Sequence, residues 1–218
     1  MRRAVAPLLL ALVIVSPLVA QSAARRDGAT HEDTSGPTTR YSRLYVFGDS
    51  YSDIGAGYID GNGPTAVAYL GWLMGLQVAS SKAANAAGKS LVFAVSGAGH
   101  FTIALLPTTI PQFAAVGLRL NPAYEQFVRE EADAAGLDLW LNHWGAAFDE
   151  VMEHPAAHGI VNTTGACAGR AIFDQDPTPV GDPATYFFYH EGHPSTAVHR
   201  IVGKKLFEEI AARPPATR

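Results

Sequence analysis

The chain has 218 residues, 20 acidic against 16 basic side chains, and a formal net charge of −4. This length suits one domain with a sizeable core, and an acidic balance without a long basic run argues against nucleic-acid binding. The single cysteine, Cys167, excludes an intramolecular disulfide and a cysteine-based zinc finger.

The N-terminal segment 1–24 has the pattern of a secretory signal peptide. It opens with two arginines, continues with a mostly apolar run over 6–20, and ends in small residues before Arg25. The uninterrupted apolar run is shorter than the roughly 20 residues of a bilayer-spanning helix. We therefore expect cleavage and a secreted or periplasmic product without a transmembrane anchor. Residues 25–40 are polar and aperiodic, which predicts a disordered linker.

Apolar β-prone runs and amphipathic segments alternate over residues 41–212, which we predict to form one domain ahead of a short tail, 213–218. The predicted strands, which stop at a glycine, serine or proline, are 43–47, 91–95 and 101–106. The predicted helices, each with apolar side chains on one face, are 64–75, 122–135, 144–152 and 196–210. An aromatic run at 187–189 precedes a His-rich turn, and Ser195 is placed to cap the last helix. This alternation indicates an α/β sandwich with a mainly parallel sheet.

Ser50 lies on the turn that follows the first predicted strand, in the run GDSYSD at residues 48–53. In an open α/β sheet, residues on such turns face the crevice where ligands bind. A serine at the start of a helix there has backbone N–H groups and the positive end of the helix dipole beside it. These groups stabilise the oxyanion of acyl transfer. Taken alone, Gly-Asp-Ser is more simply a good turn composition.

A second polar cluster, HEGHPS at residues 190–195, lies directly before the last predicted helix. A serine hydroxyl is a poor nucleophile unless a base takes its proton, and histidine titrates near the useful pH. Taken alone, this cluster is more simply a surface turn. The combination of a serine after the first strand and a histidine before the last helix favours a catalytic pair.

Several ordered segments of the chain resemble the GDSL lipase/esterase family of the SGNH hydrolases. The similar segments are 46–55 (first block), 64–76 (following helix), 93–98 (second block), 102–111 (later strand and loop) and 186–203 (closing block). The resemblance implies a flavodoxin-like three-layer α/β/α sandwich with a mainly parallel sheet. It also implies an exported esterase or lipase that acts on a small-molecule or lipid ester and needs no metal or cofactor.

The resemblance also implies roles for single residues. Ser50 would attack the ester carbonyl, and His193 would remove the serine proton and return one to the leaving alcohol. The backbone N–H groups of Ser50 and Gly97 would hold the oxyanion. The position three residues before the catalytic histidine, usually aspartate in the family, is His190 here. Glu191 could orient His193 instead, and a Ser–His dyad without a carboxylate is the other possibility.

The Gly-x-Asn-Asp block, whose asparagine donates to the oxyanion in the family, does not occur in this sequence. Only residues 96–100 separate two predicted strands, whereas a parallel crossover takes about a dozen or more residues. The pair therefore forms a hairpin, one run is not a strand, or a central strand is missing. The resemblance favours a missing strand and a truncated sheet. A lost oxyanion donor costs about two to three orders of magnitude in turnover, and a lost strand exposes a sheet edge. We therefore expect weak or no esterase activity and ready aggregation.

The alternative function is a catalytically impaired or inactive relative that keeps the scaffold as a binding or vestigial protein. Nucleotide and metal binding are disfavoured. The GKS run at 88–90 lacks the first glycine and the leading strand of a phosphate loop. His190 and His193 are one residue too close for a His-Glu-x-x-His motif, and Pro194 would break its helix.

Overall fold

The computed structural model describes residues 41–56, 60–96, 123, 125–137, 139 and 144–213. The predictions for segments 1–24, 25–40 and 101–106, and for the tail from residue 214, lie outside this part of the chain. Within the described residues, no helix combines the length and the apolar character that crossing a membrane requires.

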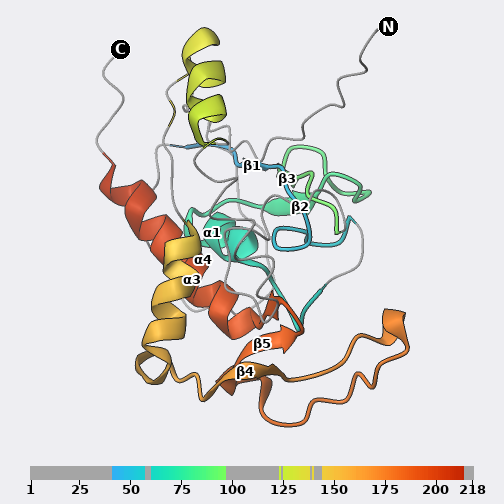
Figure 1. Ribbon diagram of the computed structural model, residues 1–218. Helices are drawn as coiled ribbons and strands as arrows, with labels where there is room; N and C mark the ends of the chain where they lie inside the picture. The colour runs from blue at the N-terminus through green and yellow to red at the C-terminus, as the bar shows by residue number, and fades with distance from the viewer. Residues whose placement is uncertain are drawn as a thin grey trace, which may run out of the picture.

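Three short strands from the first part of the described chain form a small parallel sheet (Figure 1). Its strands are β1 (Tyr45–Val46), β2 (Val78–Ser80) and β3 (Ser90–Val92), in the order β1-β3-β2. Pairing between β1 and β3 continues beyond the strand ends, because the Val95 N–H donates to the Gly48 carbonyl at 3.1 Å. The predicted strands at 43–47 and 91–95 are confirmed, whereas β2 was not predicted from the sequence.

The second sheet carries the His-rich turn. It consists of β4 (Asn162–Ala166), β5 (Tyr186–His190) and β6 (His193–Pro194). β4 and β5 are parallel, and β5 and β6 form a tight antiparallel hairpin. Gly192 lies in its turn with φ of 72°, a left-handed conformation that glycine adopts without strain. The hairpin therefore fixes the position of His193 at the start of β6.

The helices agree with the amphipathic pattern of the sequence. They are α1 (Ala66–Leu73), an unlabelled helix over 125–134, α3 (Trp144–Glu153) and α4 (Thr196–Ala212). Short 3₁₀ turns occupy η2 (Pro155–His158), η3 (Ala171–Phe173) and η4 (Pro183–Thr185). Ser195 caps α4 as predicted, since its hydroxyl accepts from the Val198 N–H.

α4 contacts both α1 and α3 and holds the two sheets against one core (Figure 1). Gly203 lets α4 approach α1 closely, because a Cβ there would lie 2.6 Å from the Ala66 carbonyl oxygen. On its other side, α4 contributes apolar side chains to a core centred on the fully buried Phe148 and Phe187. α1 and α4 thereby set the distance between two segments. One is the turn at residues 48–53 that carries Ser50, called the nucleophile turn below, and the other is the β5–β6 hairpin that carries His193, called the histidine hairpin.

The molecule is an α/β protein with small, mostly parallel sheets and several helices, as the sequence predicts at this level. The order of the described strands differs from the flavodoxin-like arrangement, in which the first strand lies between the second and third. Here β3 is central, because the unpredicted short strand β2 pairs with its outer edge.

Candidate active site

The nucleophile turn is a single helical turn and not the start of a longer helix, which corrects the sequence-based expectation. The Ser52 and Asp53 N–H groups both donate to the Asp49 carbonyl, at 3.0 and 2.9 Å. The Asp49 carboxylate accepts from the Tyr51 N–H at 3.1 Å. One turn aligns few peptide dipoles, so the helix dipole beside Ser50 is smaller than expected.

Asp53 ties this turn to the end of β3. Its carboxylate accepts from the backbone N–H groups of Gly55 and Ala56 at 2.8 and 2.7 Å. The other oxygen accepts from the Ser96 N–H at 2.7 Å. The buried carboxylate is thus held by backbone donors, and it fixes the nucleophile turn without pointing to a catalytic role.

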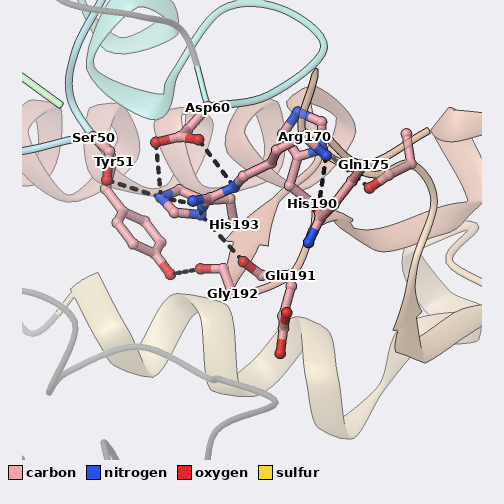
Figure 2. Close-up of polar contacts among 10 residues, drawn as sticks. Ser50, Tyr51, Asp60, Arg170, Gln175, His190, Glu191, Gly192 and His193 are labelled. Atoms are coloured by element: carbon pink, nitrogen blue, oxygen red, sulfur yellow. Dashed lines mark hydrogen bonds and ion pairs between the residues drawn. The ribbon is translucent and has the colours of Figure 1, made fainter. Parts of the chain in front are cut away.

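The structure brings Ser50 and His193 together as the sequence predicts. Ser50 Oγ lies 2.8 Å from His193 Nε2, although the two residues are 143 positions apart (Figure 2). Ser50 is half-buried, and the His193 side chain is 12% exposed. This is hydrogen-bond distance between a potential nucleophile and a potential base, the geometry that nucleophilic catalysis requires.

The carboxylate nearest to His193 belongs to Asp60 and not to Glu191. Asp60 Oδ2 lies 3.4 Å from Nε2, and its side chain is 3% exposed. The Glu191 contact with His193 is made by its backbone carbonyl oxygen, 3.4 Å from Nδ1. Its exposed carboxylate points away from the imidazole (Figure 2). His190 Nδ1 donates to the Ala168 carbonyl oxygen at 3.1 Å, so its ring is held by β-sheet backbone and does not take the place of the orienting acid.

Arg170 occupies the side of the imidazole where an orienting acid was expected. Its Nη2 contacts His193 Nδ1 and lies 3.4 Å from Nε2, while its Nε lies 3.2 Å from Asp60 Oδ1. The Arg170 side chain is 15% exposed. Within the described residues Nε makes no hydrogen bond, so its attraction to Asp60 is that of an ion pair.

Two partners of His193 Nδ1, Arg170 and the Glu191 carbonyl oxygen, favour different tautomers of the imidazole. A guanidinium group only donates, so a hydrogen bond from Arg170 to Nδ1 places the ring hydrogen on Nε2, whereas a hydrogen bond to the Glu191 carbonyl oxygen places it on Nδ1. Burial and the positive charge of Arg170 lower the pKa of His193 to about 4. At neutral pH the imidazole is therefore neutral, and its Nε2 faces Ser50 Oγ and Asp60.

Tyr51 fastens the histidine hairpin onto the nucleophile turn. Its ring stacks on the His193 imidazole, with centroids 5.2 Å apart and planes 25° apart. Its hydroxyl donates to the Gly192 carbonyl. Burial, and next the charge of Asp49, raise the pKa of Tyr51, so the phenol stays protonated and keeps donating.

Deeper in the core, His199 accepts from the Ala66 N–H at 3.3 Å and is fully buried. A cavity of about 10 Å³ lies between it, Asp60, Thr65 and Ser50. That volume is about one water molecule.

One predicted part of the oxyanion site is not placed. Gly97 lies outside the described residues. No asparagine was assigned as a donor, and Asn62 accepts from the Thr196 N–H at 2.9 Å, a contact at the start of α4.

Sequence reasoning missed Asp60 and Arg170. Asp60 precedes a Gly-Asn-Gly run, in which an acid looks like turn composition. Arg170 follows Gly169 in a loop without periodicity, and no pattern in the sequence marks it. No protein-family model matches the chain, and no curated protein sequence matches it.

Proposed function

We propose that this chain is an exported serine hydrolase of the GDSL/SGNH type that cleaves carboxylic esters through an acyl-enzyme on Ser50. The observation that best supports this function is the 2.8 Å contact between Ser50 Oγ and His193 Nε2. It joins the two segments that most resemble the family, the Gly-Asp-Ser turn and the His-Pro pair. The signal-like segment 1–24 supports export.

In the proposed reaction, Ser50 Oγ attacks the ester carbonyl carbon while His193 Nε2 takes the hydroxyl proton. The carbonyl π electrons move onto oxygen, and the Ser50 and Gly97 N–H groups stabilise that oxyanion. Collapse of the intermediate breaks the bond to the alcohol, which leaves with the proton from His193. Water then attacks the acyl-enzyme by the same steps and releases the acid. Asp60 faces the imidazolium that forms in both steps.

The second candidate is an inactive relative, and one observation favours it. The contact between Arg170 and Nδ1 favours the tautomer in which Nε2 carries the proton. A nitrogen that already carries hydrogen cannot accept the serine proton. Activity therefore requires that His193 reach its other tautomer.

Labelling by a fluorophosphonate probe separates the two candidates, because the probe reacts only with an activated serine. We expect the purified chain to be labelled slowly and Ser50→Ala not at all. Ser52→Ala, in the same turn, is the matched control and should be labelled like the wild type. In parallel, Ser50→Ala should lower turnover of 4-nitrophenyl esters by about a thousandfold or more. Equal turnover by Ser50→Ala and the wild type would exclude the proposed nucleophile.

A further inference from the structure

We infer that Arg170 is a positioning residue that holds His193 in its non-basic tautomer, so that the hydrolase rests in a latent state. The inference rests on the proposed function for its catalytic consequence. It follows from the partners of one atom, His193 Nδ1. That atom has a donor, Arg170 Nη2, on one side and an acceptor, the Glu191 carbonyl oxygen, on the other (Figure 2).

These two partners select opposite tautomers. When Nδ1 accepts from Arg170, the ring hydrogen lies on Nε2, and Ser50 has no base. When Arg170 withdraws, an Nδ1–H can donate to the Glu191 carbonyl oxygen, 3.4 Å away in the described arrangement. Nε2 then presents its lone pair to Ser50 Oγ. The backbone carbonyl thus takes the orienting role that an aspartate has in a catalytic triad.

Arg170 lies at the base of a segment that can move without disturbing the core. Residues 171–182 are all exposed and include the 3₁₀ turn η3. The segment is closed at its base by two backbone hydrogen bonds, from Gly169 to Asp176 and from Val180 to Cys167, each 2.8 Å long. Segments with few buried contacts open at low free energy, so withdrawal of Arg170 does not require global unfolding.

Charged and titratable groups reach His193 from every neighbouring element. Tyr51 comes from the nucleophile turn, Asp60 from the loop before α1, and Arg170 from the segment after β4. His190 on β5 adds a smaller effect that lowers the pKa of His193, and His193 in turn lowers the pKa of His199 on α4. Among these groups, Arg170 is the cation in contact with Nδ1. Replacing it removes the donor and leaves Asp60 to favour the protonated ring.

The first test measures the tautomer directly, in the wild-type chain. Two-bond ¹H–¹⁵N correlation spectra of ¹⁵N-histidine protein distinguish Nε2–H from Nδ1–H, and the signals lost in His193→Asn assign the residue. We expect the Nε2–H form at pH 7. An Nδ1–H form there would overturn the inference, whatever the enzyme's activity. This measurement is independent of the Arg170 variant, which removes one ion pair of the buried Asp60 and so lowers the stability of the chain.

The second test follows the rate of fluorophosphonate labelling of Ser50 from pH 5 to 9. Labelling of the wild type should be slow, and its rate should be nearly independent of pH. The Arg170→Met variant should be labelled at pH 8.5 about tenfold or more faster than the wild type. This is the ratio expected from the loss of one hydrogen bond to a charged group. The labelling rate of this variant should fall as pH decreases, because His193 then becomes protonated. Arg200→Met, a replacement at an exposed position on α4, is the matched control and should behave like the wild type.

The outcomes separate the two proposals. The role of Arg170 is overturned if a folded Arg170→Met variant is labelled no faster than the wild type and its labelling rate does not change with pH. Ser50 would then remain the proposed nucleophile. If neither chain is labelled at any pH, the proposed function fails, and the tautomer spectrum still decides which proton position Arg170 imposes.

Discussion

At the scale of single residues, the site is defined by the surroundings of one imidazole. His193 contacts a hydroxyl and a carboxylate at Nε2, and a guanidinium at Nδ1. The carboxylate lies on the same side of the ring as the serine, so it does not orient the ring from behind. It can instead stabilise the positive charge that develops on the His193 imidazole when Ser50 loses its proton in the proposed reaction.

This arrangement predicts different effects for two acidic residues. Asp60→Asn should lower kcat for a 4-nitrophenyl ester by about tenfold or more, since a carboxylate beside an imidazolium makes a charge-assisted contact. Glu191→Gln should change kcat by less than about twofold, because its contact with His193 is made by backbone. Rates are compared on protein shown to be folded by circular dichroism. A larger loss for Glu191→Gln than for Asp60→Asn would restore Glu191 as the orienting acid.

The buried histidines predict a loss of stability in acid. The pKa values of His193 and His199 are lowered to about 4 and about 3, against about 6.5 in an unfolded chain. Above pH 6.5 both states are neutral, and these groups leave stability unchanged. As pH falls below 6.5, the unfolded chain binds protons that the native chain rejects. The free energy of unfolding should then fall by up to about 1.4 kcal/mol per pH unit for each histidine.

Urea unfolding at pH 8, 6 and 5 measures this dependence. His199→Gln should reduce the slope between pH 6 and 5, while replacing the exposed His154 by Gln serves as the matched control. Equal unfolding free energies at pH 8 and pH 5 would contradict the buried, neutral state of the two rings.

At the scale of elements, the site depends on how α1 meets α4. The Tyr69 hydroxyl and Thr196 Oγ1 are 2.9 Å apart, and Thr196 Oγ1 also donates to the Pro64 carbonyl at 2.9 Å. These hydrogen bonds join the start of α4, just after His193, to the loop that leads from Asp60 into α1. The relative position of Asp60 and His193 is therefore set by helix packing.

Gly203→Ala should disturb this packing. A Cβ at this position would lie 2.6 Å from the Ala66 carbonyl oxygen and 2.7 Å from Tyr69 Cβ. Alanine favours a helix by about 1 kcal/mol over glycine, but overpacking against the backbone typically costs about 1–3 kcal/mol. We expect lower stability in urea unfolding and slower labelling of Ser50. Lys204→Ala, on the exposed side of α4, should change stability by less than about 0.5 kcal/mol. A Gly203→Ala chain more stable than the wild type would show that α1 and α4 have room to separate.

The elements that the sequence predicted well are those with a local physical signal. α4 has an amphipathic stripe and a serine cap, and α3 stops before Pro155. β2 has three residues and β4 is rich in threonine and glycine, so neither presents an apolar run. In the site, Ser50 and His193 were predictable because their flanking residues form recognisable motifs. Asp60 and Arg170 reach His193 only through tertiary folding, which leaves no local pattern.

At the scale of the whole molecule, apolar side chains on the surface bear on the expected aggregation. Val161 and Val180 are 82% and 76% exposed, and both flank the sheet that carries His193. Among the described strands, β1 pairs with β3 alone. Exposed apolar groups and sheet edges favour association between copies.

Replacing Val161 and Val180 together by threonine should reduce this association. Threonine keeps the β-branched shape and adds a hydroxyl, so unfolding free energy should change by less than about 0.5 kcal/mol per site. Static light scattering over a range of protein concentrations measures the effect. Unchanged scattering would locate the association elsewhere, for example at the β1 edge.

Cys167 gives the chain an intrinsic reporter of the exposed segment that follows it. It is the only cysteine in the sequence, it is fully buried, and its thiol contacts the Gly181 carbonyl at 3.6 Å. A thiol reagent can reach the sulfur only when the base of that segment opens. Arg170 lies three positions further along the chain. The ratio of native to unfolded alkylation rates therefore gives the fraction of time that the segment is open, without any label or substitution.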